Sequence, residues 1–220
     1  MENSGTAAQA APKRAARTRN RRGEGGRLRD DIIAAAVELL DEAGDERAIT
    51  LRSVARKVGI AAPSIYPHFP DQPAIMLAVV QREFAELRDG LRAAVAKAGS
   101  DPRQRLHAVC TTYLDFAQLR PERYRTMFGG LWMPDLDDSS LTEADLAALG
   151  DETMQILIDA LAECAAAGES ASTDPSSDAV ALWLGLHGLA HQRAVAPAFP
   201  WPPDIAERII AALAHLTGPT

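Results

Sequence analysis

The residues best suited to chemistry lie in one short stretch, residues 48–69, and that chemistry is hydrogen bonding to nucleic acid. No Asp or Glu occurs between residues 47 and 70, where the basic residues are Arg47, Arg52, Arg56 and Lys57. The side chains that can donate to phosphate oxygens are Ser64, Tyr66 and His68. Arg52 can present a bidentate fork to a guanine edge, and Pro63 can touch a thymine methyl group.

The elements that must position these residues are two short helices around a glycine. Thr50 can cap a helix that ends before Gly59, and a second short helix is expected from about Ala62 to His68. The apolar positions are spaced to pack the two helices together; they are Leu51, Val54, Ala55, Val58, Ile60, Ile65 and Phe69. This pattern predicts a helix-turn-helix whose second helix enters a major groove. The alternative is an ordinary helical hairpin with a solvated basic face. It explains less well why the glycine turn, the apolar packing positions and the acid-free polar surface occur together.

The flanking segments extend this unit on both sides. An apolar stripe at helical spacing starts at Leu28 and stops at Gly44, and Asp71 with Pro73 opens a long helix. Before the stripe lies a basic tail, which comprises Lys13, Arg14, Arg17, Arg19, Arg21, Arg22, Arg27 and Arg29. We expect Arg27 and Arg29 to contact DNA. For the remainder, an arm in the minor groove and a solubilising tail are about equally supported.

The rest of the chain reads as helices. We expect them at 101–119, 121–128, 141–167 and 177–194, with a last one opened by Pro203. The prediction is an all-α fold of about nine helices, with an N-terminal three-helix helix-turn-helix domain and a helical C-terminal domain for ligand binding and dimerisation. The expected divisions are a disordered basic arm (1–26), the DNA-binding domain (27–72) and the second domain (73–220).

Charge and composition narrow the function classes. The net charge is −7, but residues 1–70 hold 12 Lys and Arg against 9 Asp and Glu, so the negative charge lies in the remainder of the chain. We find no catalytic constellation, cofactor motif or metal-ligand spacing, so we expect no enzyme, no cofactor and no metal. The longest uncharged apolar run, residues 179–192, is too short to span a bilayer. We therefore expect a cytoplasmic protein without a membrane partner.

Residues 28–80 resemble the TetR family of bacterial regulators. The resemblance rests on the T-L-R-S-V-A-R-K-V-G-I run, the I-Y-P-H-F run and the aliphatic residues that follow. It implies a dimer whose DNA contacts include Thr50, Arg52, Pro63, Ser64, Tyr66 and His68. Many relatives have Ser or Thr where this chain has Ala61, and a polar or basic residue at Ala62. A weaker helix cap and one missing DNA contact follow from these differences.

The string W-x-x-x-H-G from Trp183 to Gly188, with the R-P-E-R-Y-R-T-M-F-G run at 120–129, resembles a C-terminal domain of one TetR subgroup. The resemblance implies that the last two helices form a four-helix bundle with a partner chain. The dimer contacts would then be Leu182, Leu186, Leu189, Ile205, Ile209 and Leu213. Gly185 and Gly188 lower helix propensity, which is understandable if another helix packs closely there.

In relatives, the inducer binds between the long fourth helix and the middle helices. The corresponding candidates are Tyr113, Phe116, Phe128, Trp132, Trp183 and His187. Each of them taken alone fits a core position better, but as a group they predict a pocket. The resulting hypothesis is a homodimeric repressor that an unidentified small molecule releases from a palindromic DNA operator. The alternative is a ligand-independent DNA-binding or architectural protein that uses its C-terminal region only to dimerise.

Overall fold

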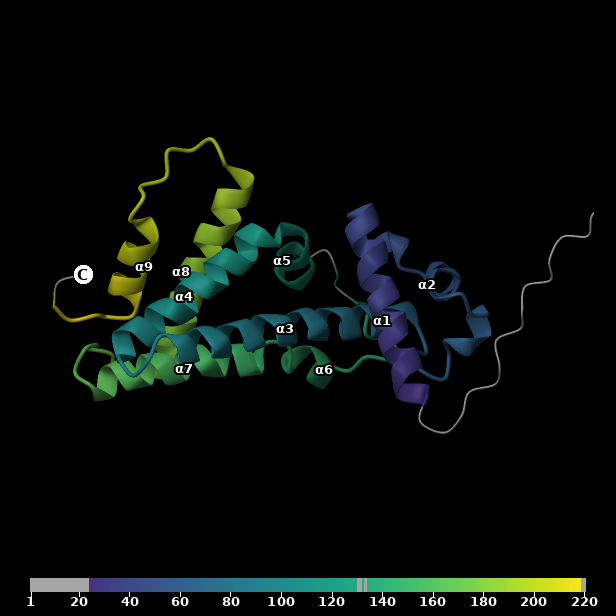
Figure 1. Ribbon diagram of the computed structural model, residues 1–220, viewed down its shortest axis with the longest axis horizontal. Helices are drawn as coiled ribbons and strands as arrows, with labels where there is room; N and C mark the ends of the chain where they lie inside the picture. Colours follow the sequence, from purple (N-terminus) through teal and green to yellow (C-terminus); the bar gives the residue numbers. More distant parts are fainter. Residues whose placement is uncertain (1–23, 130–131, 133, 219–220) are drawn as a thin grey trace, which may run out of the picture.

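The computed structural model describes residues 24–129, 132 and 134–218. These residues form helices and connecting loops, so the predicted all-α fold is confirmed (Figure 1). The α-helices are α1 (Glu24–Ala43), α2 (Leu51–Val58), α3 (Gln72–Lys97), α4 (Pro102–Leu119), α5 (Pro121–Phe128), α6 (Glu143–Ala147), α7 (Asp151–Ala166), α8 (Pro175–Val195) and α9 (Ile205–Leu213). Two short 3-10 helices, η1 (Glu46–Ala48) and η2 (Ala62–Ser64), lie on either side of α2.

The buried side chains fall into two clusters joined by α3. One cluster contains residues of α1, α2 and the first turns of α3, and the other contains residues from Leu87 of α3 to Ala214. Figure 1 shows α3 running from the α1–α2 lobe into the lobe of the remaining helices. The predicted domain boundaries stay a prediction, although α1 begins at Glu24 rather than at the expected residue 27. Residues 1–23 of the predicted arm lie outside the described residues.

Local signals placed most helix ends correctly. Gly44 follows α1 with a φ of 64°, and Gly59 ends α2 with a φ of 79°, both in the left-handed region that favours glycine. Thr50 caps α2, with its hydroxyl accepting from the Ser53 N–H at 3.0 Å. Asp71 and Asp101 cap α3 and α4 in the same way, each through a side-chain oxygen.

The expected helix from Ala62 to His68 is wrong. The segment starts as the 3-10 helix η2 and continues as turns to His68, whose N–H donates to the carbonyl oxygen of Ile65 at 2.8 Å. Ala61 has no side-chain oxygen to cap the first turn, and Pro67 has no amide proton to extend the helix. Residues 62–68 therefore form a compact turn rather than a regular α-helix.

The single helix expected over 141–167 is also wrong, because the chain breaks between α6 and α7. Gly150 lies at the break with a φ of 85°. Its α-carbon is close enough to Phe84 of α3 that an added Cβ would lie 2.9 Å from the ring. The described residues form nine α-helices, which is the predicted number. The agreement arises because the helix expected at 62–68 is absent and the one expected at 141–167 is divided in two.

The close approach predicted at Gly185 is confirmed. A Cβ there would lie 2.5 Å from Cδ1 of Leu213 and 3.0 Å from Cγ2 of Ile209, both on α9. The same expectation is wrong for Gly188, which is exposed: a Cβ added there would have no atom of a neighbouring described element within 4 Å. The two glycines therefore face different surroundings on one helix.

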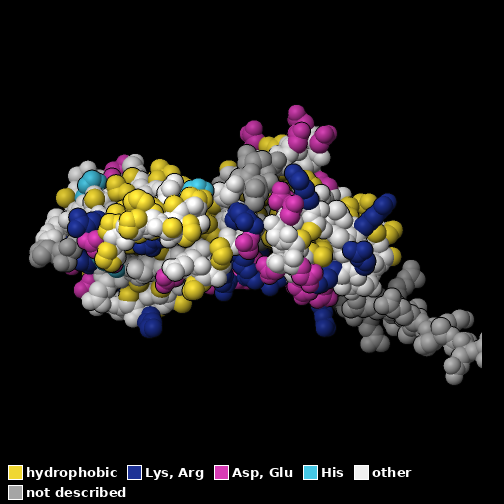
Figure 2. Space-filling model, turned by 90° about the horizontal axis from the view of Figure 1, so that it is seen from above, with side chains coloured by type: hydrophobic (Ala, Val, Ile, Leu, Met, Phe, Trp, Pro, Cys, Tyr) yellow, Lys and Arg dark blue, Asp and Glu magenta, His cyan; other side chains and the backbone are white. Residues whose placement is uncertain are grey.

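The surface differs between the two lobes. Figure 2 shows hydrophobic side chains gathered on the lobe that contains α8 and α9, whereas Lys and Arg are scattered over the α1–α2 lobe. The large exposed apolar residues of the lobe with α8 and α9 include Leu119, Val180, Leu184, Val195 and Phe199. No helix in the described part of the chain is long and apolar enough to cross a membrane.

Candidate functional site

The α2–η2 unit presents most of the predicted DNA contacts to solvent. Arg52, Pro63 and Ser64 are exposed, and the Tyr66 side chain is 56% exposed although it is large and aromatic. His68 is half-buried. Beneath them, Val54, Ala55, Ile65 and Phe69 are buried, which fixes the turn against α1 and α3. The arrangement offers polar and basic side chains from a rigid base, as groove binding requires.

Two predicted contacts have an additional structural role. The Thr50 hydroxyl accepts from the Ser53 N–H and is hydrogen-bonded to the Ser53 hydroxyl at 3.0 Å, so it caps α2. The guanidinium carbon of Arg29 lies 5.0 Å from the centre of the Phe69 ring, a distance typical of a cation–π contact. Arg27 is exposed on the same helix, and the basic residues before it, Lys13 to Arg22, lie outside the described residues.

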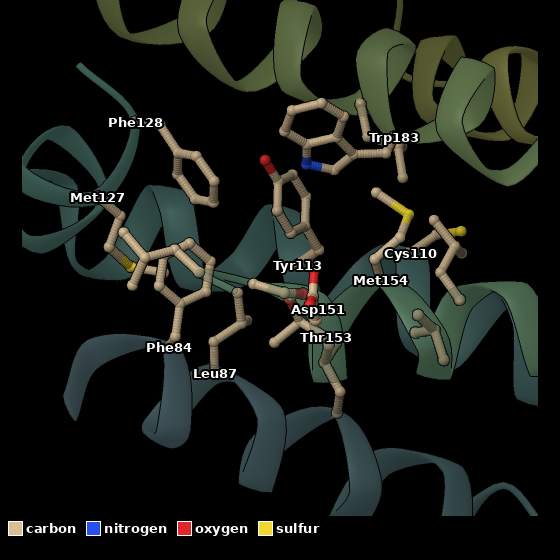
Figure 3. Close-up of a pocket in the computed structure, with 16 residues that line it drawn as sticks. Phe84, Leu87, Cys110, Tyr113, Met127, Phe128, Asp151, Thr153, Met154 and Trp183 are labelled. Carbon is tan, nitrogen blue, oxygen red and sulfur yellow. Dashed lines mark hydrogen bonds between the residues drawn. The ribbon is translucent and has the colours of Figure 1, made fainter. Parts of the chain in front are cut away.

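A cavity of about 380 Å³ lies in the other lobe, between α3, α4, α5, α7 and α8 (Figure 3). Its wall is mostly apolar and contains Phe84, Leu87, Leu91, Val109, Cys110, Tyr113, Met127, Phe128, Leu149, Gly150, Asp151, Thr153, Met154, Leu157, Trp183 and Leu186. This size and composition are those of a site for a small organic molecule. Five helices meet there, so the cavity exists only in the folded chain.

The predicted pocket residues divide into three groups. Tyr113, Phe128 and Trp183 line the cavity. His187 lies behind them, with ring centres 5.3 Å from Phe128 and 5.4 Å from Trp183. Phe116 packs against the same core outside the lining, and Trp132 packs against the α1–α2 cluster instead.

A hydrogen-bonded group joins three helices behind the cavity wall. The Tyr113 and Tyr124 hydroxyl oxygens are 3.0 Å apart, and Nδ1 of His187 lies 3.2 Å from the first and 2.6 Å from the second. Burial lowers the pKa of His187 and raises the pKa of both tyrosines. All three side chains are therefore neutral near neutral pH. In the tautomer of His187 that carries its proton on Nε2, Nδ1 is an acceptor for the tyrosine hydroxyls.

Family comparisons match both lobes. Residues 32–79 match the family described as bacterial regulatory proteins, tetR family, and residues 106–216 match the one described as Tetracyclin repressor-like, C-terminal domain. The second match spans half of the chain. The protein belongs to the TetR family. The predicted resemblance is thereby confirmed at the level of the family.

Individual relatives give the same picture. The HTH-type transcriptional activator FasR of Mycolicibacterium smegmatis is 30% identical over 120 residues, which are 54% of this chain and 50% of that protein. The match thus spans about half the length of this relative. A protein of unknown function from Rhodococcus sp. RHA1 has a TM-score of 0.69 at 26% identity, covering 88% of this chain and 95% of that one. FadR from Bacillus subtilis, solved with stearoyl-CoA, shares the fold at 15% identity, with a TM-score of 0.64 over 84% of this chain and 95% of that one.

Several cavity residues of this TetR-family chain were missed at the level of sequence. Phe84 belongs to the apolar stripe of α3. The sequence therefore indicated that it faces inward, but not that it faces a cavity. Met127 sits on the short α5, and Asp151, Thr153 and Met154 lie on α7, whose start could not be located without the break at Gly150. In one continuous helix over 141–167, the side chains of these α7 residues would not all face the cavity.

Helix α5 connects the cavity to the DNA-binding lobe. Met127 and Phe128 line the cavity, while Arg123 donates to Glu86 of α3 at 3.0 Å and lies 3.8 Å from Asp41 of α1. Arg125 donates to the carbonyl oxygen of Gly44 at 3.2 Å, immediately after α1. One short helix therefore touches both the cavity and the end of α1.

Three of the six predicted dimer residues are buried inside the chain, whereas Ile205, Ile209 and Leu213 are half-buried. Leu182, Leu186 and Leu189 of α8 are buried in the core of a single chain, which leaves their side chains no surface for a partner. Ile209 and Leu213 of α9 are packed against Gly185. The amphipathic pattern of the three leucines marked a buried face correctly, and that face packs against helices of the same chain. A dimer contact through Ile205, Ile209 and Leu213 stays a prediction.

Proposed function

We propose that the protein is a homodimeric, ligand-responsive transcriptional regulator that represses from a palindromic operator and is released by a small molecule. The observation that carries this proposal is the 380 Å³ cavity whose wall includes α5, the helix that also contacts α1. The W-x-x-x-H-G subgroup is proposed on the string from Trp183 to Gly188 alone.

The DNA-binding half of the proposal rests on the α2–η2 surface. Arg52, Ser64 and Tyr66 are exposed together above a buried apolar base. In a two-fold dimer, two such surfaces would read successive major grooves, which are about 34–36 Å apart along the duplex. A change in their separation would weaken both half-sites at once.

The regulatory half of the proposal rests on the contacts that α5 makes with the cavity and with the end of α1. A ligand that displaces Met127 or Phe128 also shifts the arginines of the same short helix. Arg123 and Arg125 would transmit that shift to Asp41 and to the carbonyl of Gly44. Coupling arises only when the ligand binds more tightly to the conformation that does not fit DNA.

The dimer interface that we propose is the outer face of α8, with α9 beside it. Val180, Leu184, Gly188 and Val195 are exposed at helical spacing, and Gly188 leaves room for the backbone of a second helix. Figure 2 shows this lobe to be rich in surface hydrophobic side chains. Exposed apolar surface of this kind is typical of a protein interface.

A substitution tests the interface. Leu184→Arg places a charge in the centre of the proposed contact and should produce monomers in sedimentation equilibrium at micromolar concentration. Ala93→Arg, on the exposed side of α3, is the control and should remain dimeric. A dimeric Leu184→Arg variant would show that the interface lies elsewhere.

The ligand-independent alternative predicts a C-terminal lobe filled by side chains. The open cavity favours the ligand-responsive function instead. The same fold holds stearoyl-CoA in the FadR structure, so it can enclose a small molecule.

The decisive experiment measures operator binding with and without a cavity ligand. The operator is selected from genomic DNA with the full chain, and compounds are identified by the rise that they cause in the melting temperature. A cavity binder should lower operator affinity about 5- to 150-fold, the usual range of allosteric coupling. Arg125→Ala should bind the compound equally well but lose most of the effect on DNA. Unchanged operator affinity at saturating compound would refute ligand responsiveness.

A further inference from the structure

The charges around the cavity are unevenly distributed. Among its lining residues, only Asp151 carries a formal charge, and no Lys or Arg lines it. Tyr113 and Cys110 are neutral because burial raises the pKa of both side chains, and the neutral His187 behind them adds no positive charge. The wall therefore has a charge of about −1 near neutral pH.

Asp151 is available for a ligand. It is the first residue of α7 and is exposed, and no hydrogen bond or ion pair joins its carboxylate to another described side chain. Figure 3 shows Asp151 and Thr153 together near the middle of the lining residues.

Aromatic rings line the cavity from α3 to α8. Phe84 and Phe128 meet edge to face with ring centres 5.5 Å apart, and Phe128 and Trp183 have centres 6.2 Å apart. The negative face of an aromatic ring attracts cations, most strongly for Trp. Polarisable sulfur from Met127 and Met154 completes this part of the wall.

Arg88, a basic residue next to the cavity, is already paired. A smaller hollow next to the cavity shares Phe84, Gly150 and Thr153 with it and also includes Arg88. Arg88 contacts Asp89 at 2.8 Å and Glu152 at 3.3 Å, so two acids neutralise it. An anionic ligand would find no unpaired cation on this side of the cavity among the described residues.

We infer that the cavity binds a compact lipophilic monocation, held over the faces of Phe84, Phe128 and Trp183 with its charge toward Asp151. This inference rests on the proposed ligand-responsive function and specifies the ligand class. A volume of about 380 Å³ accommodates a small aromatic or aliphatic ammonium compound. Groups that carry several negative charges, such as a nucleotide diphosphate, have no complementary side chains in the lining.

Three probes of matched shape separate charge from apolar contact. They are 4-phenylbutyl-trimethylammonium, its uncharged carbon isostere with a tert-butyl group, and 5-phenylpentanoate. Binding to the full-length dimer is measured by isothermal titration calorimetry, with operator affinity measured in parallel. The cation should bind about three- to thirtyfold more tightly than the isostere, and the anion should bind most weakly.

Two variants assign the effect to residues. Asp151→Asn should weaken cation binding about two- to fivefold, because the carboxylate is exposed, and should leave the isostere unaffected. Asp159→Asn, an exposed acid on the same helix outside the lining, is the control. Phe84→Leu keeps the wall apolar but removes an aromatic face. It should therefore weaken binding of the cation more than binding of the isostere.

The outcomes distinguish the ligand class from the proposed function. Equal binding of cation and isostere, tighter binding of the anion, or no binding of any probe would overturn the monocation inference. In the first two cases the cavity still binds a ligand, and only operator affinity that stays constant at saturation would count against the ligand-responsive function.

Discussion

The hydroxyl oxygen of Tyr124 lies 2.6 Å from Nδ1 of His187, which links α5 to α8 across the back of the cavity. Their rings are also in contact, with centres 5.6 Å apart. The preceding residue of α5, Arg123, is held by Glu86 and Glu83 of α3. The short helix between cavity and DNA-binding lobe is thus fixed by polar contacts to both α8 and α3.

Replacing Tyr124 with Phe should lower the free energy of unfolding by about 1–2 kcal/mol, because it removes the closest donor to a partly buried imidazole nitrogen. Urea denaturation measures the change. Tyr66→Phe is the matched control: that side chain is 56% exposed, so its hydroxyl is hydrated in the folded protein. Equal stability losses in the two variants would contradict a special role for the Tyr124 hydroxyl.

The contribution of His187 to stability should fall as the pH is lowered from 7 to 5. The folded-state pKa of His187 is below its ordinary value of 6.5, mainly through burial and also through the nearby His191. The unfolded chain therefore binds more protons in this range, and protonation favours unfolding. His107, whose pKa is also lowered by burial, contributes with the same sign.

His187→Asn should flatten this pH dependence, since the amide oxygen can accept a hydrogen bond without titrating. Thermal unfolding between pH 5 and 7 provides the measurement, and His68→Asn, a half-buried position in the other lobe, serves as the control. If wild type and His187→Asn lose stability in parallel, His187 does not titrate as described.

Neutral substitutions at Glu83 and at Arg123 should have different effects on the free energy of unfolding. The Glu83 side chain is almost fully buried, one of its oxygens has no hydrogen-bond partner, and burial raises its pKa despite the opposing charge of Arg123. At pH 7 the ionised carboxylate opposes folding, so Glu83→Gln should leave stability unchanged or raise it by up to about 1 kcal/mol. Arg123→Met should destabilise by about 2 kcal/mol, because the buried carboxylate loses its partner.

Urea denaturation at pH 7 compares the two variants. Below the ordinary pKa of Glu, the side chain at position 83 is uncharged in both proteins: a protonated carboxyl in wild type and an amide in Glu83→Gln. The difference in stability between the two proteins should therefore vanish there. A large destabilisation by Glu83→Gln at pH 7 would indicate that the ion pair with Arg123 outweighs the cost of burying it.

The two glycines of the W-x-x-x-H-G string provide an internal comparison. Gly185→Ala should lower stability by about 1 kcal/mol, since overlap with Leu213 and Ile209 exceeds the gain in helix propensity. Within a single chain Gly188→Ala meets open space, so in the monomeric Leu184→Arg background it should raise stability by about 0.5–1 kcal/mol. If the melting temperatures of the two variants shift in the same direction, the packing described for α8 and α9 is contradicted.

A restored cap should strengthen the DNA-reading turn. Ala61 makes no side-chain hydrogen bond at the start of η2, so Ala61→Ser should raise stability by about 0.5–1 kcal/mol. Thr50→Ala removes an existing cap and should lower it by about 1 kcal/mol. Both effects are measured as shifts in melting temperature, and no gain from Ala61→Ser would mean that water caps η2 as well as a hydroxyl does.

Local physics explains how much the sequence predicted. Helical periodicity, the capping oxygens of Thr50, Asp71 and Asp101, and glycine at left-handed positions act within a few residues, so α1 to α5 were largely readable, apart from the turn at η2. The buried base of the helix-turn-helix was readable for the same reason. These features determined the fold class, the family and the exposed polar surface of the α2–η2 unit.

The tertiary structure decided what each buried face packs against. An apolar stripe such as Leu182, Leu186 and Leu189 indicates burial, but hydrophobic burial is non-directional and does not distinguish a helix of the same chain from one of a partner. The break at Gly150 lies against Phe84, which is distant in sequence, so closely that an added Cβ would be 2.9 Å from its ring. The cavity and its single charge at Asp151 follow from that break, because it sets which residues of α7 face α3, α4 and α8.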